Sequence, residues 1–192
     1  MIFLTVLFLF VLIILAVTAI DAFLVIRFLS DIYSDFKGAP FVPVPYGVGR
    51  KMLELAGVGP DDVLFDLGCG DGRLLLMAVR DFGARRAVGY EVSPFPYLKA
   101  LLRAMLWKKA RNGRIKIYRR DLFSVDLDQA TVVVLYLTEK LLERLKIKLQ
   151  KELKPGVRIV TARYPINGWR EEEKDNSAQF PIWLYRNRNL EK

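Results

Sequence analysis

The sequence predicts an α/β fold, a parallel sheet with helices on both faces, preceded by one N-terminal transmembrane helix. Three observations lead to this prediction. Residues 1–20 carry no charged side chain. From Asp62 onward, short apolar runs alternate with longer amphipathic stretches, as strands and helices do in such folds. Residues 65–73 read Phe-Asp-Leu-Gly-Cys-Gly-Asp-Gly-Arg, a glycine-rich turn typical of ligand sites at the carboxyl ends of parallel strands.

Residues 1–27 are predicted to be a membrane anchor. As a helix, the uncharged run of residues 1–20 would be about 30 Å long, the thickness of a bilayer core. A cleaved signal peptide is the alternative, but it would have a basic start and a shorter apolar core. All 30 Lys and Arg lie at or beyond Arg27. The positive-inside rule therefore predicts that the domain lies on the cytosolic side of the membrane.

The remaining elements follow in order. Residues 28–45 are predicted to be a juxtamembrane linker, because a glycine and three prolines near its end favour an extended path. Residues 46–192 form the predicted folded domain, which begins with a short helix over 48–56. Its strands are expected over 62–67, 86–91, 114–119, 130–137, 156–163 and 180–186. Its further helices are expected over 73–82, 94–111 and 139–153.

Two of these helices have clear starts. Ser93 and Pro94 predict one start, because serine is a good N-cap and proline fits the first helical position. Thr138 is the predicted cap of the last helix. The helix over 94–111 has apolar residues on one face at the spacing of an amphipathic helix, namely Leu98, Leu101, Leu102, Met105 and Leu106.

Composition excludes several classes of protein. The chain has one cysteine, so it has no intramolecular disulfide, and it has no histidine, the commonest metal ligand and general base. A metalloenzyme and a Ser-His-Asp hydrolase are therefore not expected. The net charge is +9, and nine basic residues with no acid lie between Glu91 and Asp121. Such a run suits nucleic acid, an anionic bilayer surface, an acidic protein or simply solvent.

The spacing of the glycine turn distinguishes between ligands. Gly68, Gly70 and Gly72 form Gly-x-Gly-x-Gly, whereas a dinucleotide fingerprint would place its third glycine at Arg73. Asp66 stands just before the turn. This acid and the wider loop favour a cationic amino-acid ligand such as S-adenosylmethionine over a pyrophosphate.

Further acids follow the next strands. Glu91 ends the second strand, where an acid can accept hydrogen bonds from both ribose hydroxyls. Asp121 ends the third, where it either accepts from an adenine amino group, with Leu122 or Phe123 on the ring, or caps a helix. Asp66 can pair with an ammonium group of the ligand.

Asp71 lies inside the glycine turn and has two interpretations. It is either a further ligand contact or the N-cap of the helix that follows. The residues alone leave both open.

Together these features resemble the class I, seven-strand S-adenosylmethionine-dependent methyltransferases, which have a Rossmann-like sheet. The chain also resembles the archaeal protein-lysine methyltransferases and the mitochondrial enzymes that methylate ATP synthase subunit c and the adenine nucleotide translocase. The resemblance covers roughly residues 40–186. It rests on the stretches FVPVP at 41–45, DLGCGDGR at 66–73, VGYE at 88–91, ATVV at 130–133, LQKELKPG at 149–156 and GW at 168–169.

The resemblance implies methyl transfer from S-adenosylmethionine to lysine side chains of a protein substrate. It also implies that residues 41–45, including Pro43, fold over the cofactor. The mitochondrial members are membrane-associated, which fits the predicted anchor, whereas the broad-range archaeal relatives are typically soluble. Tethering is therefore expected to restrict this chain to membrane proteins and their neighbours.

The chemistry of methyl transfer agrees with a chain that has no histidine and no expected metal site. A methyl sulfonium is already an activated electrophile and requires no metal, so alignment of the two reactants is the enzyme's main task. The lysine, with a pKa of about 10.4, must lose its proton, which an apolar pocket favours. Tyr136, at the end of the fourth strand, is the predicted catalytic-pocket residue, with a buried core tyrosine as the alternative. Tyr164 and Trp169 are further candidates.

Two other functions remain open. One is an RNA or small-molecule methyltransferase on the same fold, with the basic run as the RNA-binding face. The other is a membrane module that binds S-adenosylmethionine without catalysis. Residues 135–138 read Leu-Tyr-Leu-Thr rather than Asp/Asn-Pro-Pro-Tyr/Phe, which counts against methylation of adenine or cytosine amino groups.

Overall fold

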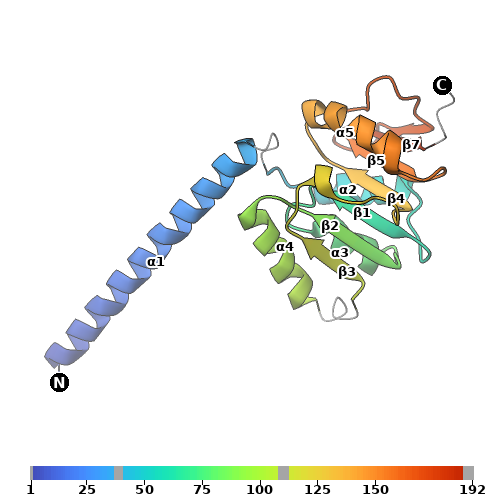
Figure 1. Ribbon diagram of the computed structural model, residues 1–192. Coiled ribbons are helices and arrows are strands. Elements are labelled where there is room, and N and C mark those ends of the chain that lie inside the picture. Colours follow the sequence, from blue (N-terminus) through green and yellow to red (C-terminus); the bar gives the residue numbers. More distant parts are fainter. Residues whose placement is uncertain (1, 37–40, 108–112, 188–192) are drawn as a thin grey trace.

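The computed structural model describes residues 2–36, 41–107 and 113–187. A long helix, α1 (Ile2–Phe36), projects from an α/β domain (Figure 1). Within the described ranges, seven strands form one sheet in the order β3-β2-β1-β4-β5-β7-β6. Their bounds are β1 (Val63–Leu67), β2 (Arg86–Tyr90), β3 (Ile115–Tyr118), β4 (Val132–Leu135), β5 (Arg158–Ala162), β6 (Glu173–Asp175) and β7 (Ile182–Arg186).

Helices cover both faces of this sheet. They are α2 (Tyr46–Leu55), α3 (Arg73–Arg80), α4 (Pro94–Leu106) and α5 (Glu139–Glu152), with a short 3-10 helix, η2 (Leu122–Ser124). One core cluster joins α2 and α3 to one face of the sheet, and a second joins α5 to the other face. This arrangement confirms the predicted Rossmann-like fold with seven strands.

The central strands are buried on both faces. All five residues of β1 are buried, and the strand pairs in parallel with β2 on one side and β4 on the other. A strand in that position reads as a continuous apolar run rather than an alternating one. This explains why the sequence predicted β1 within one residue of its observed bounds.

The far edge of the sheet differs from the all-parallel prediction. β7 pairs antiparallel with β5, and β6 pairs antiparallel with β7. The sequence did not predict β6, because its three residues read Glu-Lys-Asp and none is buried. Such an edge strand carries no apolar signature by which a pattern could detect it.

The N-terminal helix is longer than predicted. It continues from the predicted anchor through Phe36, so the first part of the predicted linker is helical. The chain contains no glycine or proline before Gly38 to end the helix. The span Ile2–Ser30 is long and apolar enough to cross a membrane, and its most apolar window is not buried against the domain. Residues 37–40 of the linker lie outside the described residues, and 41–45 form no regular secondary structure.

Helix α4 begins at Pro94 after the predicted N-cap Ser93. The structure describes it to Leu106, and residues 108–111 of the predicted helix lie outside the described residues. Its buried residues are Pro96 and Ala100. The leucine-rich face, which an amphipathic pattern normally places on the core, is largely exposed. The sequence thus predicted the helix but not the side on which it packs.

Candidate active site

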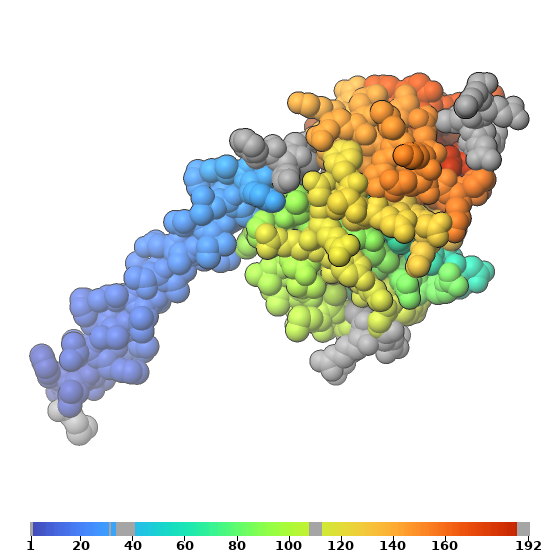
Figure 2. All heavy atoms as spheres, in the orientation of Figure 1, coloured from blue at the N-terminus to red at the C-terminus, as the bar shows by residue number. Residues whose placement is uncertain are grey.

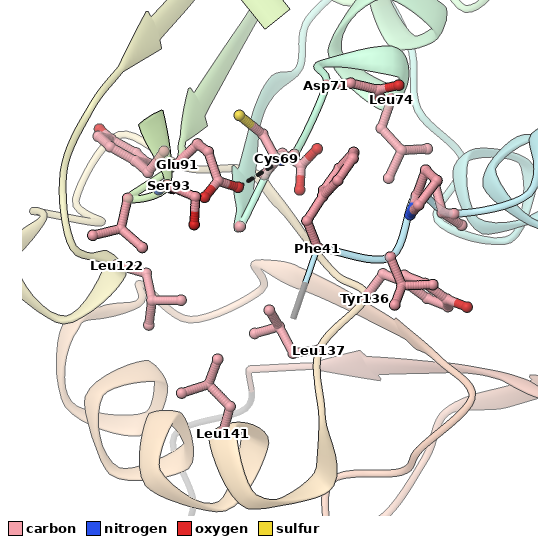
Figure 3. Close-up of a pocket in the computed structure, with 18 of the residues that line it drawn as sticks. Phe41, Cys69, Asp71, Leu74, Glu91, Ser93, Leu122, Tyr136, Leu137 and Leu141 are labelled. Atoms are coloured by element: carbon pink, nitrogen blue, oxygen red, sulfur yellow. Dashed lines mark hydrogen bonds between the residues drawn. The ribbon is translucent and has the colours of Figure 1, made fainter. Parts of the chain in front are cut away.

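A cavity of about 250 Å³ lies at the carboxyl ends of β1, β2 and β4 (Figure 3). The turns after β1 and β2, the 3-10 helix after β3, the end of β4 and residues 41–44 line it. The strand order reverses at β1, with β2 and β3 on one side of it and β4 on the other, and such a reversal leaves a crevice at the strand ends. The predicted site residues that line this cavity are Pro43, Asp66, Gly68, Gly70, Asp71, Glu91, Asp121, Leu122 and Tyr136.

The glycine turn approaches its neighbours closely. Gly70 has a φ of 54°, and a Cβ there would lie 2.6 Å from Cε2 of Phe41. Gly72 is the N-cap of α3 and does not line the cavity. A Cβ on Gly72 would lie 3.1 Å from Cβ of Ala100 on α4. Gly70 therefore shapes the cavity, whereas Gly72 serves the packing of two helices.

Glu91 connects the two turns. Its Oε2 accepts a hydrogen bond from the N–H of Gly70 at 2.9 Å, and its Oε1 accepts one from the N–H of Ser93 at 2.8 Å. The side chain is buried, so both bonds are shielded from solvent. A carboxylate has about four acceptor positions, which leaves capacity for a ligand's hydroxyls. Binding of ribose by Glu91 stays a prediction that this geometry permits.

Asp66 is buried beneath the glycine turn and lines the cavity. Burial raises the pKa of its carboxyl well above the ordinary value, and the nearby carboxylates of Glu91 and Asp71 raise it further. Among the hydrogen bonds and ion pairs of the described residues, none involves this carboxylate. A cationic ligand in the cavity would supply the missing partner. The site therefore fits a molecule that carries an ammonium group.

Asp71 takes part in an ion-pair network. Its Oδ2 lies 2.7 Å from Nη2 of Arg73 and 2.8 Å from Nη1 of Arg103. Burial raises the pKa of Asp71, but the hydrogen bonds from the two arginines outweigh this effect and lower it. The N-cap of α3 is Gly72, one residue later than the N-cap interpretation of Asp71. Asp71 thus joins α3 to α4 at the wall of the cavity.

Arg73 fixes the segment that completes the cavity. Its Nη1 donates a hydrogen bond to the carbonyl oxygen of Val44 at 2.9 Å. Its Cζ lies 4.8 Å from the ring centroid of Tyr46. Pro43 therefore lies at the cavity as the resemblance implied, and its contact with cofactor stays a prediction. The sequence showed Arg73 only as the residue that breaks a dinucleotide spacing, so its role was missed.

The adenine end of the predicted site is formed by η2. Asp121 is the N-cap of this 3-10 helix, and its Oδ1 accepts a hydrogen bond from the N–H of Phe123 at 3.0 Å. The helix-cap alternative for Asp121 is therefore confirmed. The capping residue also lines the cavity beside Leu122, so the cap and an adenine contact are compatible.

Tyr136 lies at the opposite end of the cavity. Figure 3 shows its ring on the other side of Phe41 from Glu91, and Leu137 and Leu141 continue the apolar wall. Tyr164 and Trp169 do not line this cavity but pack on the second core cluster. These two candidates therefore lie outside the lining of this cavity.

Two further arginines at the cavity, besides Arg73, were not predicted as site residues. Arg120 and Arg144 both line it, and Cζ of Arg144 lies 4.6 Å from the ring centroid of Phe123. In the sequence, Arg144 lies between Lys140 and Lys148 at a spacing of four residues, as on an ordinary solvent-facing side of a helix. Its place at the cavity depends on how α5 packs, and the local pattern does not reveal this.

The sequence of this chain is similar to those of known methyltransferases. The family model of the ANTKMT methyltransferase domain matches residues 66–173. The chain is also 42% identical over 150 residues to a protein-lysine N-methyltransferase of Saccharolobus islandicus, across 76% of this chain and 92% of that protein. The chain belongs to the ANTKMT methyltransferase family. Membership confirms the predicted enzyme class, a class I S-adenosylmethionine-dependent methyltransferase.

Two mammalian relatives of this chain are named for different protein substrates. The adenine nucleotide translocase lysine N-methyltransferase of Mus musculus is 33% identical over 156 residues, 78% of this chain and 66% of that protein. A lysine N-methyltransferase of Rattus norvegicus, named for the C-subunit of ATP synthase, is 31% identical over 148 residues, 76% of this chain and 65% of that protein. The chain thus matches about two thirds of these mammalian proteins.

One solved structure bears on the cofactor. An RNA methyltransferase from Salinibacter ruber in complex with S-adenosyl-L-homocysteine has a TM-score of 0.73 and 34% identity, covering 79% of this chain and 97% of that one. S-adenosylhomocysteine is what remains of S-adenosylmethionine after methyl transfer. The predicted cofactor is thereby confirmed.

Proposed function

We propose that this chain is a membrane-anchored enzyme that transfers methyl groups from S-adenosylmethionine to lysine side chains of proteins. The observation that carries the proposal is its 42% identity to a protein-lysine N-methyltransferase across 92% of that protein. The mouse and rat relatives are also named for lysine methylation. The substrates in their names are an adenine nucleotide translocase and the C-subunit of ATP synthase, which supports a protein as acceptor.

The cavity provides a place for each part of the cofactor. The unpartnered carboxylate of Asp66 pairs with the ammonium group, and Glu91 accepts hydrogen bonds from the ribose hydroxyls. Asp121 and Leu122 hold the adenine, and Pro43 lies over the bound molecule. The backbone at Gly68 and Gly70 approaches the cofactor without an intervening Cβ. Bound here, the cofactor supplies a methyl group on a sulfonium.

The chain's part in the reaction is to deliver a neutral amine. Tyr136, Leu137 and Leu141 form an apolar wall beside the cavity. Such a wall disfavours the charged ammonium by desolvation, so the lysine loses its proton to water before or during approach. Holding the amine nitrogen in line with the methyl carbon then provides a large part of the rate acceleration.

The N-terminal helix supports a membrane location for this chemistry. The span Ile2–Ser30 is long and apolar enough to cross a membrane, and its most apolar stretch is not covered by the domain. An apolar helix of this length exposed to water would be unfavourable, whereas a bilayer core accommodates it. The absence of basic residues before Arg27 supports a cytosolic position for the domain.

The test uses the full chain in liposomes with methyl-labelled S-adenosylmethionine and a membrane extract. Label that survives nuclease, is removed by protease and maps to lysine by mass spectrometry is the expected result. Asp66→Asn is the matched inactive control, because it removes the carboxylate that pairs with the ammonium group. Label on another residue type, or no label in the presence of cofactor binding, contradicts the proposal.

RNA methylation is the second candidate. It is favoured by the 34% identity to the Salinibacter ruber protein, whose name specifies RNA. The basic run between Glu91 and Asp121 would serve as the RNA-binding face. The same experiment separates the two, since nuclease treatment would then abolish the label and protease treatment of the acceptor would leave it.

A further inference from the structure

The outer face of α4 is unusually apolar. Its exposed residues are Leu98, Lys99, Leu102, Met105 and Leu106. Leu102 is 50% exposed, Met105 68% and Leu106 83%. On α5, by contrast, every exposed residue is polar or charged except Ile147. A contiguous apolar face of this kind on a folded domain indicates a surface that something covers.

The position of α4 identifies what covers it. The N–H of Phe95 donates a hydrogen bond to Oγ of Ser30 on α1 at 3.1 Å. The rings of Phe23 and Phe95 meet edge to face with centroids 5.5 Å apart. Phe23 and Ser30 lie at the domain-proximal end of the apolar span of α1. Helix α4 therefore starts at the level where the proposed membrane-spanning segment ends.

The arrangement of the two helices in space agrees with this placement. Figure 1 shows α4 on the side of the domain that faces α1. In Figure 2 the green atoms of this part of the chain lie at the surface beside the light-blue end of the long helix. A bilayer around α1 would meet this side of the domain first.

Charge on and around the helix suits anionic lipid. The sequence from Val92 to Arg120 contains no acidic residue. Lys99 is exposed on α4, and its Nζ lies 4.5 Å from the ring centroid of Phe95. A lysine in this position can extend its ammonium group to lipid headgroups while its stem stays on apolar surface. A water-facing helix would not combine such a charge with a leucine-rich face.

We propose that α4 is an interfacial helix that lies on the anionic bilayer surface and buries Leu98, Leu102, Met105 and Leu106 at the boundary of headgroups and acyl chains. The inference rests on the proposed insertion of α1 in the membrane. Val92 and Ser93, which directly precede α4, line the cavity. Docking of α4 therefore holds the active site next to the bilayer and selects lysines that lie close to its surface.

Spin labels on single cysteines test this placement in the full chain, reconstituted in liposomes of phosphatidylcholine and phosphatidylglycerol. Labels replace two α4 residues (Leu102→Cys and Leu106→Cys), one α1 residue (Leu15→Cys) and the exposed α5 residue (Ile147→Cys). The native Cys69 is buried, and the unsubstituted chain gives the background. Collision rates with oxygen, which enriches in lipid, and with a water-soluble nickel chelate are then compared by electron paramagnetic resonance.

Labels at 102 and 106 are expected to collide with oxygen several-fold more than with nickel, as the label at 15 does, whereas the label at 147 favours nickel. Nickel access at 102 and 106 equal to that at 147, with 15 still in lipid, overturns the docking of α4 alone. Shielding of the α4 labels from both reagents also overturns it and indicates a protein partner or second copy. A water-exposed label at 15 overturns the membrane anchor, and the docking with it.

Discussion

Replacement of Glu91 with alanine tests both the architecture and the binding role of the site. The side chain accepts two backbone hydrogen bonds, from Gly70 at 2.9 Å and from Ser93 at 2.8 Å. It also lines the cavity where the ribose is proposed to bind. The substitution Glu91→Ala removes all of these interactions in one step without adding bulk.

The expected magnitudes follow from the hydrogen bonds. Leaving one buried N–H without a partner costs about 1–3 kcal/mol, so two such groups lower the free energy of unfolding by about 2–6 kcal/mol. Water that enters the adjoining cavity shifts this toward the lower end. Loss of the ribose contacts weakens cofactor binding by a further ~1–3 kcal/mol, about 5- to 150-fold in the dissociation constant.

The assay measures the two effects separately. Chemical denaturation of the full chain in detergent reports the free energy of unfolding. Calorimetric titration with S-adenosylhomocysteine reports the affinity for the cofactor product. It is carried out without denaturant, at a temperature where the variant is folded. Glu143→Gln, at an exposed position on α5, is the control for loss of a carboxylate and should change neither quantity.

Two results would refute the reasoning. Unchanged stability would mean that the two N–H groups find other partners, so Glu91 does not hold the turns together. Unchanged affinity in a folded variant would remove Glu91 from the ribose site. If stability falls at the same time, this second result assigns Glu91 a purely structural role.

Four further outcomes are expected. Cofactor affinity should fall as the pH drops through the raised pKa of Asp66, because pairing with an ammonium needs the ionised carboxylate; titrations of Asp66→Asn should show weaker binding without this pH dependence. Gly70→Ala should lower stability by about 1–2 kcal/mol through its left-handed backbone and displace Phe41, whereas Gly59→Ala, with no close neighbour, should be near neutral by thermal denaturation. Arg73→Met should weaken cofactor binding in calorimetric titration, because the bond that holds the carbonyl of Val44 is lost; unchanged affinity would contradict the clamp. Tyr136→Ala should lower the turnover number more than cofactor affinity, and Tyr136→Phe should retain most activity if the ring acts as a wall.

The sequence predicted best the elements that are buried on both sides. All residues of β1 and β2 are buried except the half-buried Arg86 at the start of β2. Both strands therefore appear as apolar runs, interrupted only by Asp66 and Arg86, and both were predicted to within one residue at each end. The sequence pattern did not predict β6, because an exposed edge strand needs no apolar residues. The antiparallel β7 was predicted as a strand, but its direction depends on how the chain returns to the sheet.

Helix α4 shows what periodicity does not reveal. The spacing of its leucines predicts a helix and an apolar face, but a helix can present that face to a core or to a membrane. Small residues, Ala100 among them, make its contact with the domain, and the Cβ of Ala100 packs against Gly72. The pattern therefore indicated the apolar face without indicating what it contacts.

The sequence could predict site residues whose position depends only on an acid near the end of a strand. Asp66 lies near the end of β1, and Glu91 and Asp121 come after β2 and β3. Parallel strands bring these carboxyl ends together. The partners of Asp71 were not predictable, because Arg103 comes from a different helix and reaches it only through the packing of α3 against α4. Arg73 was visible in the sequence, but its bond to Val44 depends on the path of the covering segment.

Five consecutive residues connect the cofactor site to the proposed anchor. Glu91 holds the glycine turn, Val92 and Ser93 line the cavity, Pro94 begins α4, and Phe95 contacts α1. A domain on a flexible linker would sample every orientation within its reach. Here α4 contacts α1 through a hydrogen bond and a ring pair, and this contact restricts the orientations that the domain can adopt. The cavity would then stay at a similar height above the bilayer surface. Selection of a lysine would then depend on its height above the bilayer, which the local sequence around that lysine does not encode.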